Sequence, residues 1–147
     1  MSGEEMLQGF FSGDASRILK ACHAVNHAAI SDRETIEAVA VYLDEIREVV
    51  KGKSYGGAVL PNQRFVDRAV TIIEESKRPT CLCKYVFDGF AQCAASLERS
   101  YGFILESEET KGFVNSGIIR CPRCGQRYLV EEEFTGWHMT STRHRPI

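Results

Sequence analysis

Apolar residues recur at helical spacing along the first half of the chain, in three stripes that each fit one helix face. The first stripe follows Asp14, which suits an N-cap, and the second follows a capping-box pattern at residues 31–34 and continues as one helix to Gly52. The third begins after Pro61, which suits a first helical turn. The stripes are Ile18, Leu19, Cys22, Val25 and Ala29; Ile36, Val39, Ala40, Leu43, Ile46 and Val50; and Phe65, Val66, Ala69, Ile72 and Ile73. Short connections favour antiparallel neighbours, so residues 1–79 are predicted to form a helical array.

Beyond residue 79 the pattern changes to short runs of aromatic and β-branched residues separated by glycine-bearing turns. These runs, which predict strands of a small antiparallel sheet, are residues 81–87, 103–106, 117–120, 127–132 and 137–142. Residues 90–99 favour a short helix instead, because Phe90, Cys93, Ala94 and Leu97 fall on one helix face. The sequence therefore predicts an α+β fold, with a helical region at 1–79 and a β-rich, zinc-binding region at 80–147 that together could form one compact unit.

Composition narrows the function classes. The 147 residues, 44% of them hydrophobic, suit one ordinary domain or two small ones. The 18 basic and 20 acidic residues give a formal charge of −2, which excludes the global basic field that favours non-specific nucleic-acid binding. No apolar run has the length of a membrane helix, and the acidic N-terminus is unlike a signal peptide. We expect a soluble, cytoplasmic protein that has no membrane partner.

Cysteines carry the strongest chemical signal. The six are Cys22, Cys81, Cys83, Cys93, Cys121 and Cys124. The cytoplasm keeps thiols reduced, so cysteines that cluster there more often bind a metal than form disulfides. Four of them form two tight pairs, Cys81 with Cys83 and Cys121 with Cys124, separated by the 37 residues 84–120. Together the pairs supply the four thiolates of a closed tetrahedral zinc site, and these four cysteines are the predicted ligands.

The segment Cys121-Pro-Arg-Cys-Gly125 resembles the zinc knuckle of the zinc-ribbon and rubredoxin-like families. The resemblance covers residues 119–130, with strand-like flanks where those families place a hairpin. A two-residue spacer bends the chain enough to bring two sulfurs onto one ion, and Gly125 suits the positive backbone dihedral of such a turn. The first pair departs from the family pattern, because Leu82 alone separates its cysteines. On a straight strand their side chains would lie about 7 Å apart, so a kinked or bulged strand is expected.

A closed site of four thiolates leaves no position for water or substrate, so the zinc is predicted to be structural. The β-rich region is near the lower size at which burial alone stabilises a fold, and a metal is a usual remedy. Cys93, His138 and His144 lie in the same region and are the substitutes if one of the four cysteines is not a ligand.

Histidines and arginines give weaker candidates. His23 and His27 have the i, i+4 spacing of a helical metal motif, but a third ligand is not evident, and they are predicted to be solvent-facing or satisfied within the helix. Arg120, Arg123 and Arg127 surround the knuckle and could contact a partner protein or grip phosphates. Three glutamates at 131–133 follow at once and cancel the local charge.

Residues 137–139 hold the single tryptophan beside a histidine and a methionine. Strand alternation puts Trp137 and Met139 on one face, where they pack in the core or expose Trp137 as an aromatic anchor for a partner. No nucleophile elbow, phosphate-binding loop or HExxH motif occurs, so no catalytic residue is predicted.

Two functions from different classes remain. The first is a zinc-binding protein-interaction module that binds another protein; in size and charge alone, the chain resembles small bacterial immunity and adaptor proteins. The alternative is a nucleic-acid-binding zinc-ribbon protein, whose affinity would fall steeply with salt. A third, weaker reading is an enzyme with three protein ligands and a water on the metal. The sequence carries no signal of an oligomeric state.

Overall fold

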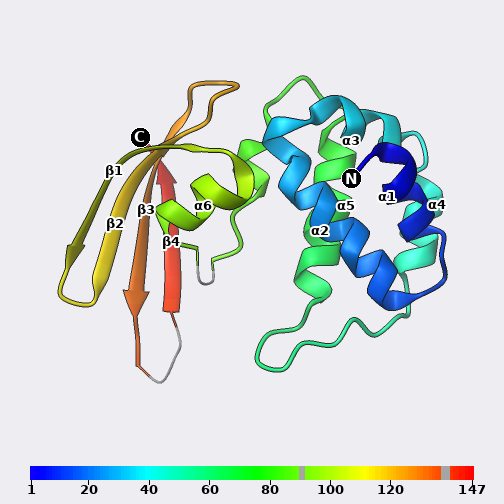
Figure 1. Ribbon diagram of the computed structural model, residues 1–147, viewed down its shortest axis with the longest axis horizontal. Helices are drawn as coiled ribbons and strands as arrows, with labels where there is room; N and C mark the ends of the chain where they lie inside the picture. The colour runs from blue at the N-terminus through cyan, green and yellow to red at the C-terminus, as the bar shows by residue number, and fades with distance from the viewer. Residues whose placement is uncertain (90–91, 137–139) are drawn as a thin grey trace. The chain divides into compact units, whose positions relative to one another are not determined.

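The computed structural model describes residues 1–89, 92–136 and 140–147. Within this range the chain has six α-helices and then a four-stranded antiparallel sheet, which confirms the predicted α+β fold class (Figure 1). The chain divides by its contacts into two compact units, Met1–Val86 and Phe87–Ile147. In the described residues, no helix combines the length and the apolar composition that crossing a membrane requires.

The first unit is a helical array. Its elements are α1 (Gly3–Phe10), α2 (Ala15–Ser31), α3 (Arg33–Ala40), α4 (Leu43–Val50), α5 (Gln63–Glu75) and the 3₁₀ helix η1 (Leu82–Tyr85). The long helix α2 packs against α1, α3 and α5, and Figure 1 shows α2 and α5 side by side. The interior is filled by side chains that are fully buried and mostly aliphatic, among them Met6, Phe10, Ile18, Val25, Ile30, Ile36, Ile46, Ile72, Ile73 and Leu82.

Helix α1 was not predicted by the stripes. Ser2 caps it through a capping box with Glu5, and Met6 and Phe10 are its two buried residues. An eight-residue helix shows only two turns of periodicity, which is too short a repeat to detect from spacing alone. The next helix begins as predicted, since the Asp14 carboxylate accepts a hydrogen bond from the Arg17 N–H at 2.8 Å.

The second predicted helix is wrong as a single element, because α3 and α4 are separate helices. The helix is interrupted at Val41 and Tyr42, where the Tyr42 N–H donates to the Val39 carbonyl at 3.0 Å. This bond spans three residues, one fewer than in an α-helix. The buried stripe continues across the break, so periodicity alone could not reveal it. The N-cap of α3 is Asp32, one residue after the predicted Ser31, and the Asp32 carboxylate accepts a hydrogen bond from the Thr35 N–H.

The second unit consists of one helix and a sheet. Its elements are α6 (Ala94–Tyr101), β1 (Ile104–Lys111), β2 (Val114–Arg120), β3 (Arg127–Phe134) and β4 (Thr140–Pro146). The strands follow one another in the order β1-β2-β3-β4, each antiparallel to the next. Helix α6 packs on β1 and β2 so closely that a Cβ on Gly117 would lie 2.3 Å from the Ala94 Cβ (Figure 1).

Of the predicted strands, the one at 81–87 is wrong and the one at 137–142 is described only in part. Residues 81–87 are not a strand, because Leu82–Tyr85 winds into η1. Leu82, Cys83 and Val86 are buried, and Lys84 is exposed. A strand would place residues 82, 84 and 86 on one face, so this burial pattern is helical. The strand predicted at 137–142 is described only from Thr140, and Trp137, His138 and Met139 lie outside the described residues. The helix predicted at 90–99 is observed as α6 with different bounds, Ala94–Tyr101, and Phe90 lies outside the described residues.

Aromatic rings fill much of the space between the sheet and the segment that leads to α6. The Phe87 ring lies 4.9 Å from the Tyr128 ring and 5.8 Å from the Phe103 ring, measured between centroids. The His144 imidazole stacks on the Phe87 ring, with a centroid distance of 4.0 Å and the two rings nearly parallel. Leu97 from α6 and Ile119 from β2 complete a small core.

Candidate metal centre

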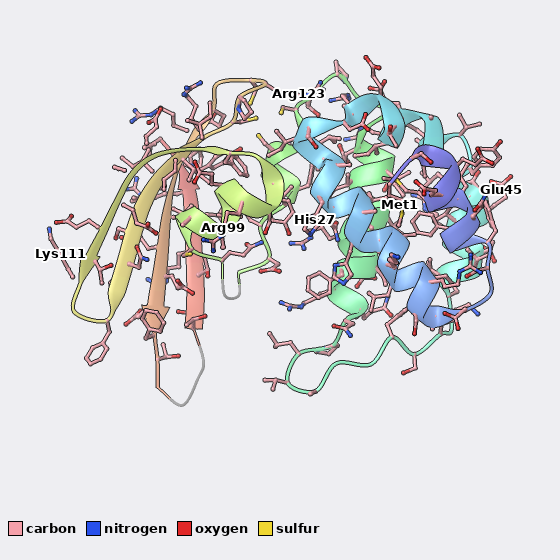
Figure 2. The ribbon with its side chains drawn as sticks, in the orientation of Figure 1. Met1, His27, Glu45, Arg99, Lys111 and Arg123 are labelled. Atoms are coloured by element: carbon pink, nitrogen blue, oxygen red, sulfur yellow. The ribbon has the colours of Figure 1, made fainter. Side chains whose placement is uncertain are left out.

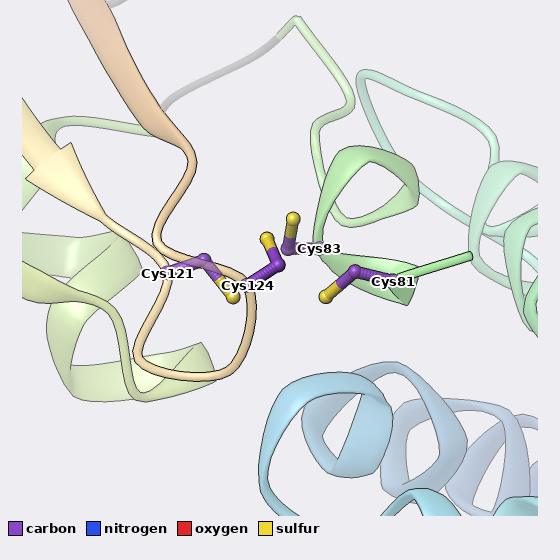
Figure 3. Close-up of side chains that lie close together, drawn as sticks. All are labelled: Cys81, Cys83, Cys121 and Cys124. Carbon is purple, nitrogen blue, oxygen red and sulfur yellow. The ribbon is translucent and has the colours of Figure 1, made fainter. Parts of the chain in front are cut away.

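Four cysteine side chains converge. The Sγ atoms of Cys81, Cys83, Cys121 and Cys124 all lie within 4.8 Å of one another (Figure 3). A zinc tetrahedron with Zn–S bonds near 2.3 Å has sulfur–sulfur edges of about 3.8 Å, so a small contraction would bring these atoms to bonding geometry. In the part of the chain that the structure describes, this is the one group of potential ligands close enough to hold a metal ion.

The second pair lies in the turn between β2 and β3. The Cys121 N–H donates to the Gln126 carbonyl at 2.9 Å, and the Gly125 N–H donates back to the Cys121 carbonyl at 2.9 Å. These two hydrogen bonds close the turn that carries Cys121 and Cys124. Gly125 has φ +76°, which a residue with a Cβ rarely adopts, and this is the positive dihedral that the sequence predicted.

Cys81 and Cys83 are brought together by the 3₁₀ helix η1 and not by the predicted bulged strand. Cys81 caps η1 and Cys83 lies within it. A 3₁₀ helix rises about 2 Å per residue along its axis against about 3.3 Å in a strand, so the turn into η1 brings Cys83 nearer to Cys81 than the almost 7 Å of a straight strand. Leu82 between the cysteines is 1% exposed and anchors the turn in the helical unit.

Burial differs across the group. Cys121 and Cys83 are buried, Cys81 is half-buried and Cys124 is exposed. None of the six cysteines of the chain forms a disulfide, and all six are described. A tetrahedral set of four sulfurs is typical of zinc and of iron–sulfur ligation, so the cluster could hold a metal ion.

The predicted substitutes lie elsewhere or outside the described residues. Cys93 occupies the N-cap position of α6 and is not a member of the group. His144 stacks on Phe87, and burial lowers the pKa of its imidazole. His138 is one of the residues that are not described. The four thiolates are therefore the set that the described residues offer.

The histidines of α2, His23 and His27, lie near Phe65 and Arg68 of α5. The His23 ring lies 4.5 Å from the Phe65 ring. Burial, His27 and the nearby Arg68 and Arg64 lower the pKa of His23, and burial and Arg68 lower the pKa of His27. No third ligand among the described residues joins this pair to form a group of metal-ligand spacing.

Two of the three predicted arginines share one carboxylate. Arg120 Nε lies 3.0 Å from Glu106 Oε1, and Arg127 Nε lies 2.8 Å from Glu106 Oε2. The hydrogen bonds from Arg127 and then Arg120 lower the pKa of Glu106. Sequence reasoning missed Glu106 because it sits at the irregularity between Leu105 and Ser107, which no residue pattern marked. Arg123, within the β2–β3 turn, is exposed (Figure 2).

The face of the sheet opposite α6 combines basic and apolar side chains. Because Gly117 faces α6, strand alternation places Ile118 and Arg120 of β2 on the opposite face. The register then aligns Leu129 with Ile118 and Arg145 with Leu129. We call this surface the open face; its members at the β2–β3 turn end are Ile104, Ile118, Arg120, Arg127, Leu129 and Arg145.

Comparisons with protein-family models, with curated proteins and with solved structures each found no match for this chain. The site therefore has to be interpreted from its own residues.

Proposed function

We propose that the chain binds one zinc ion through Cys81, Cys83, Cys121 and Cys124, and that this zinc is structural. The convergence of the four sulfurs carries the proposal. Four thiolates complete the tetrahedral shell of zinc, leaving no position for a water or a substrate. The second unit has only 61 residues, Phe87–Ile147, a size at which burial alone gives little stability.

Cobalt substitution tests this proposal. Four-sulfur Co²⁺ centres give intense thiolate charge-transfer bands and tetrahedral d–d bands, and zinc should displace the cobalt at a 1:1 ratio. Cys121→Ser should abolish the tetrahedral four-sulfur spectrum, and Cys93→Ser, the matched control outside the group, should leave it unchanged. An identical spectrum in Cys121→Ser would contradict the proposed ligand set. A bound water beside three sulfurs would instead favour the enzyme reading.

The proposed role of the metal-bound chain is to bind another protein, one that presents carboxylates next to apolar side chains. The open face supports this partner chemistry, because Leu129 pairs with Ile118 on one side and with Arg145 on the other, and Arg120 pairs with Arg127 next to them. Glu106 gives an internal example, since each of its oxygens accepts from a different arginine of this face. Arginine–carboxylate pairs next to a desolvated apolar contact are typical of protein interfaces.

Nucleic-acid binding is the second candidate, favoured by the exposed Arg123, Arg143 and Arg145. One observation weighs against it: residues 81–147 contain 8 basic and 8 acidic residues, so this half of the chain is neutral.

A binding experiment separates the two candidates. The probes are a peptide with alternating glutamate and leucine and a single-stranded oligonucleotide, each followed by NMR on the zinc-loaded protein. We expect the peptide to shift amides of the open face, and Arg145→Glu to weaken its binding. Arg99→Glu, an exposed arginine on α6, is the matched control and should have no effect. Submicromolar oligonucleotide binding in physiological salt, with no peptide binding, would overturn the protein-partner proposal.

A further inference from the structure

Arg33, the first residue of α3, reaches the segment that connects α5 to the first cysteine pair. Its Nη1 donates to the Thr80 carbonyl at 2.6 Å, and its Nη2 donates to the Ser76 carbonyl at 2.8 Å and also to the Arg78 carbonyl. Its Nε donates to Glu37 Oε1 at 2.6 Å, and the side chain is only 17% exposed. One guanidinium thus holds three carbonyls within five consecutive residues.

The N–H groups of Ser76, Lys77 and Arg78 donate back to carbonyls of the last turn of α5, at 2.9, 3.3 and 3.0 Å. The carbonyls of residues 76, 78 and 80 lie beyond the last residue of α5, where no further helical turn supplies N–H donors to them. The segment 76–80 belongs to no helix or strand, and Pro79 has no N–H to donate. A cation at this helix end also interacts favourably with the helix dipole. Arg33 therefore supplies N–H donors and a positive charge to the carbonyls that follow α5.

The hydrogen bond to Thr80 connects Arg33 to the cysteines. The Thr80 carbonyl and the Cys81 nitrogen belong to the same planar peptide unit, so fixing the carbonyl fixes the plane from which Cys81 starts. On the other side of Cys81, the buried Leu82 fixes the beginning of η1. The half-site is thus held on both sides by contacts within the helical unit alone.

We propose that Arg33 is a positioning residue for the metal centre: it pre-arranges Cys81 and Cys83 so that binding a metal costs little ordering of this segment. The inference rests on the proposed zinc site. Residues that orient metal ligands from outside the coordination shell raise metal affinity, typically by 10- to 100-fold. Arg33 acts on the backbone rather than on a sulfur, so about tenfold is expected.

The interactions of Arg33 require a guanidinium group and not only a positive charge. Its nitrogens bind carbonyls of three different residues and one carboxylate at fixed angles. A lysine ammonium keeps the charge but is a single point donor on a flexible stem. Arg33→Lys should therefore restore the interaction with the helix end without restoring the arrangement of Thr80.

The experiment measures cobalt and zinc affinity by competition with a chelator, in the full chain, alongside the thermal stability of the metal-free protein. Arg33→Gln and Arg33→Lys should each weaken metal binding by about tenfold and speed chelator-driven loss of the metal. Arg47→Gln is the matched control, because Arg47 ties α4 to α5 through Glu74 at 2.8 Å and does not hold 76–80. It should lower stability while leaving metal affinity unchanged.

A milder variant keeps the test decisive if Arg33→Gln does not fold. Glu37 orients the guanidinium from an exposed position on α3, so Glu37→Gln should fold and weaken metal binding by a smaller factor, about twofold. Wild-type affinity in the folded Arg33 variants, or in Glu37→Gln if those do not fold, would overturn the positioning role and leave the zinc proposal intact. Failure of the wild-type chain to bind either metal would instead overturn the zinc proposal.

Discussion

The two units differ in how much apolar material each buries. Among the described residues, ten of the twelve largest fully buried side chains lie in Met1–Val86, and two, Leu97 and Ile119, lie in Phe87–Ile147. Buried apolar side chains contribute about 1.5–3 kcal/mol each, so the helical unit gains more stability from burial than the sheet unit does. The sheet unit therefore depends more on other interactions, and a metal held by Cys121 and Cys124 is the strongest candidate.

Removing the metal should break this comparison most strongly. Cys121→Ser should abolish tight zinc binding and unfold the sheet unit first, because structural zinc contributes roughly 10 kcal/mol in small zinc domains. Amide hydrogen exchange would show β2 and β3 losing protection while α2 and α5 keep most of theirs. Cys93→Ser should leave both units protected. Equal loss in the two units of Cys121→Ser would mean that the metal is not specific to the stability of the sheet.

Shortening a buried side chain of the helical unit should destabilise that unit and not the sheet unit. Ile36 is fully buried in α3, so Ile36→Ala should lower the free energy of unfolding of the helical unit by about 2–5 kcal/mol. Denaturant titration followed by far-ultraviolet circular dichroism would measure the loss. Val41→Ala, at a residue that is 77% exposed in the next turn, is the control and should change stability by less than about 0.5 kcal/mol. A loss confined to the sheet unit would contradict the assignment of the two cores.

Packing of α6 on the sheet offers a smaller effect in the second unit. Gly117→Ala would place a Cβ 2.3 Å from that of Ala94, so the helix must move, at a cost of about 1–3 kcal/mol. The midpoint of thermal unfolding of the zinc-loaded protein checks this. Ser116→Ala changes the neighbouring residue on the same strand and should be nearly neutral. A stable Gly117→Ala variant would show that α6 is not fixed against β2.

The pH dependence of His144 gives the smallest expected effect. Burial lowers the pKa of this imidazole, so the folded state favours the neutral ring that stacks on Phe87. The stabilisation is complete above the ordinary histidine pKa of 6.5 and is lost as the pH falls through the lower folded value. NMR titration of the His144 ring should give a midpoint below 6.5, and Phe87→Leu should move it upward. A midpoint at or above 6.5 would contradict the packing of the ring.

Much of the helical unit could be predicted, because a buried helix face repeats in the sequence. The positions of Ile18, Val25, Ile36 and Ile72 followed from spacing alone, and all four are fully buried. The break between α3 and α4 could not be predicted, because the buried stripe keeps its period across the turn. Periodicity reports which residues face the core and says nothing of a backbone that turns between them.

The four cysteines named from the sequence lie close together in the structure, but the local structure around Cys81 was not predicted. Two pairs of cysteines are a compositional signal, and the structure brings the same four together. The strand expected at Cys81 was wrong: the prediction rested on aromatic and β-branched content, and the i, i+4 spacing of Leu82 and Val86 fits one face of a strand as well as of a helix. Arg33 and Glu106 could not be found from the sequence, since each acts on residues that only the fold brings near.

Zinc-edge X-ray absorption with elemental analysis, on protein purified without added metal or chelator, tests the central claim most directly. The predicted result is one zinc per chain, with four sulfur neighbours near 2.3 Å. A protein that folds with no bound metal, or a zinc with fewer than four sulfurs, would contradict a structural centre built from Cys81, Cys83, Cys121 and Cys124.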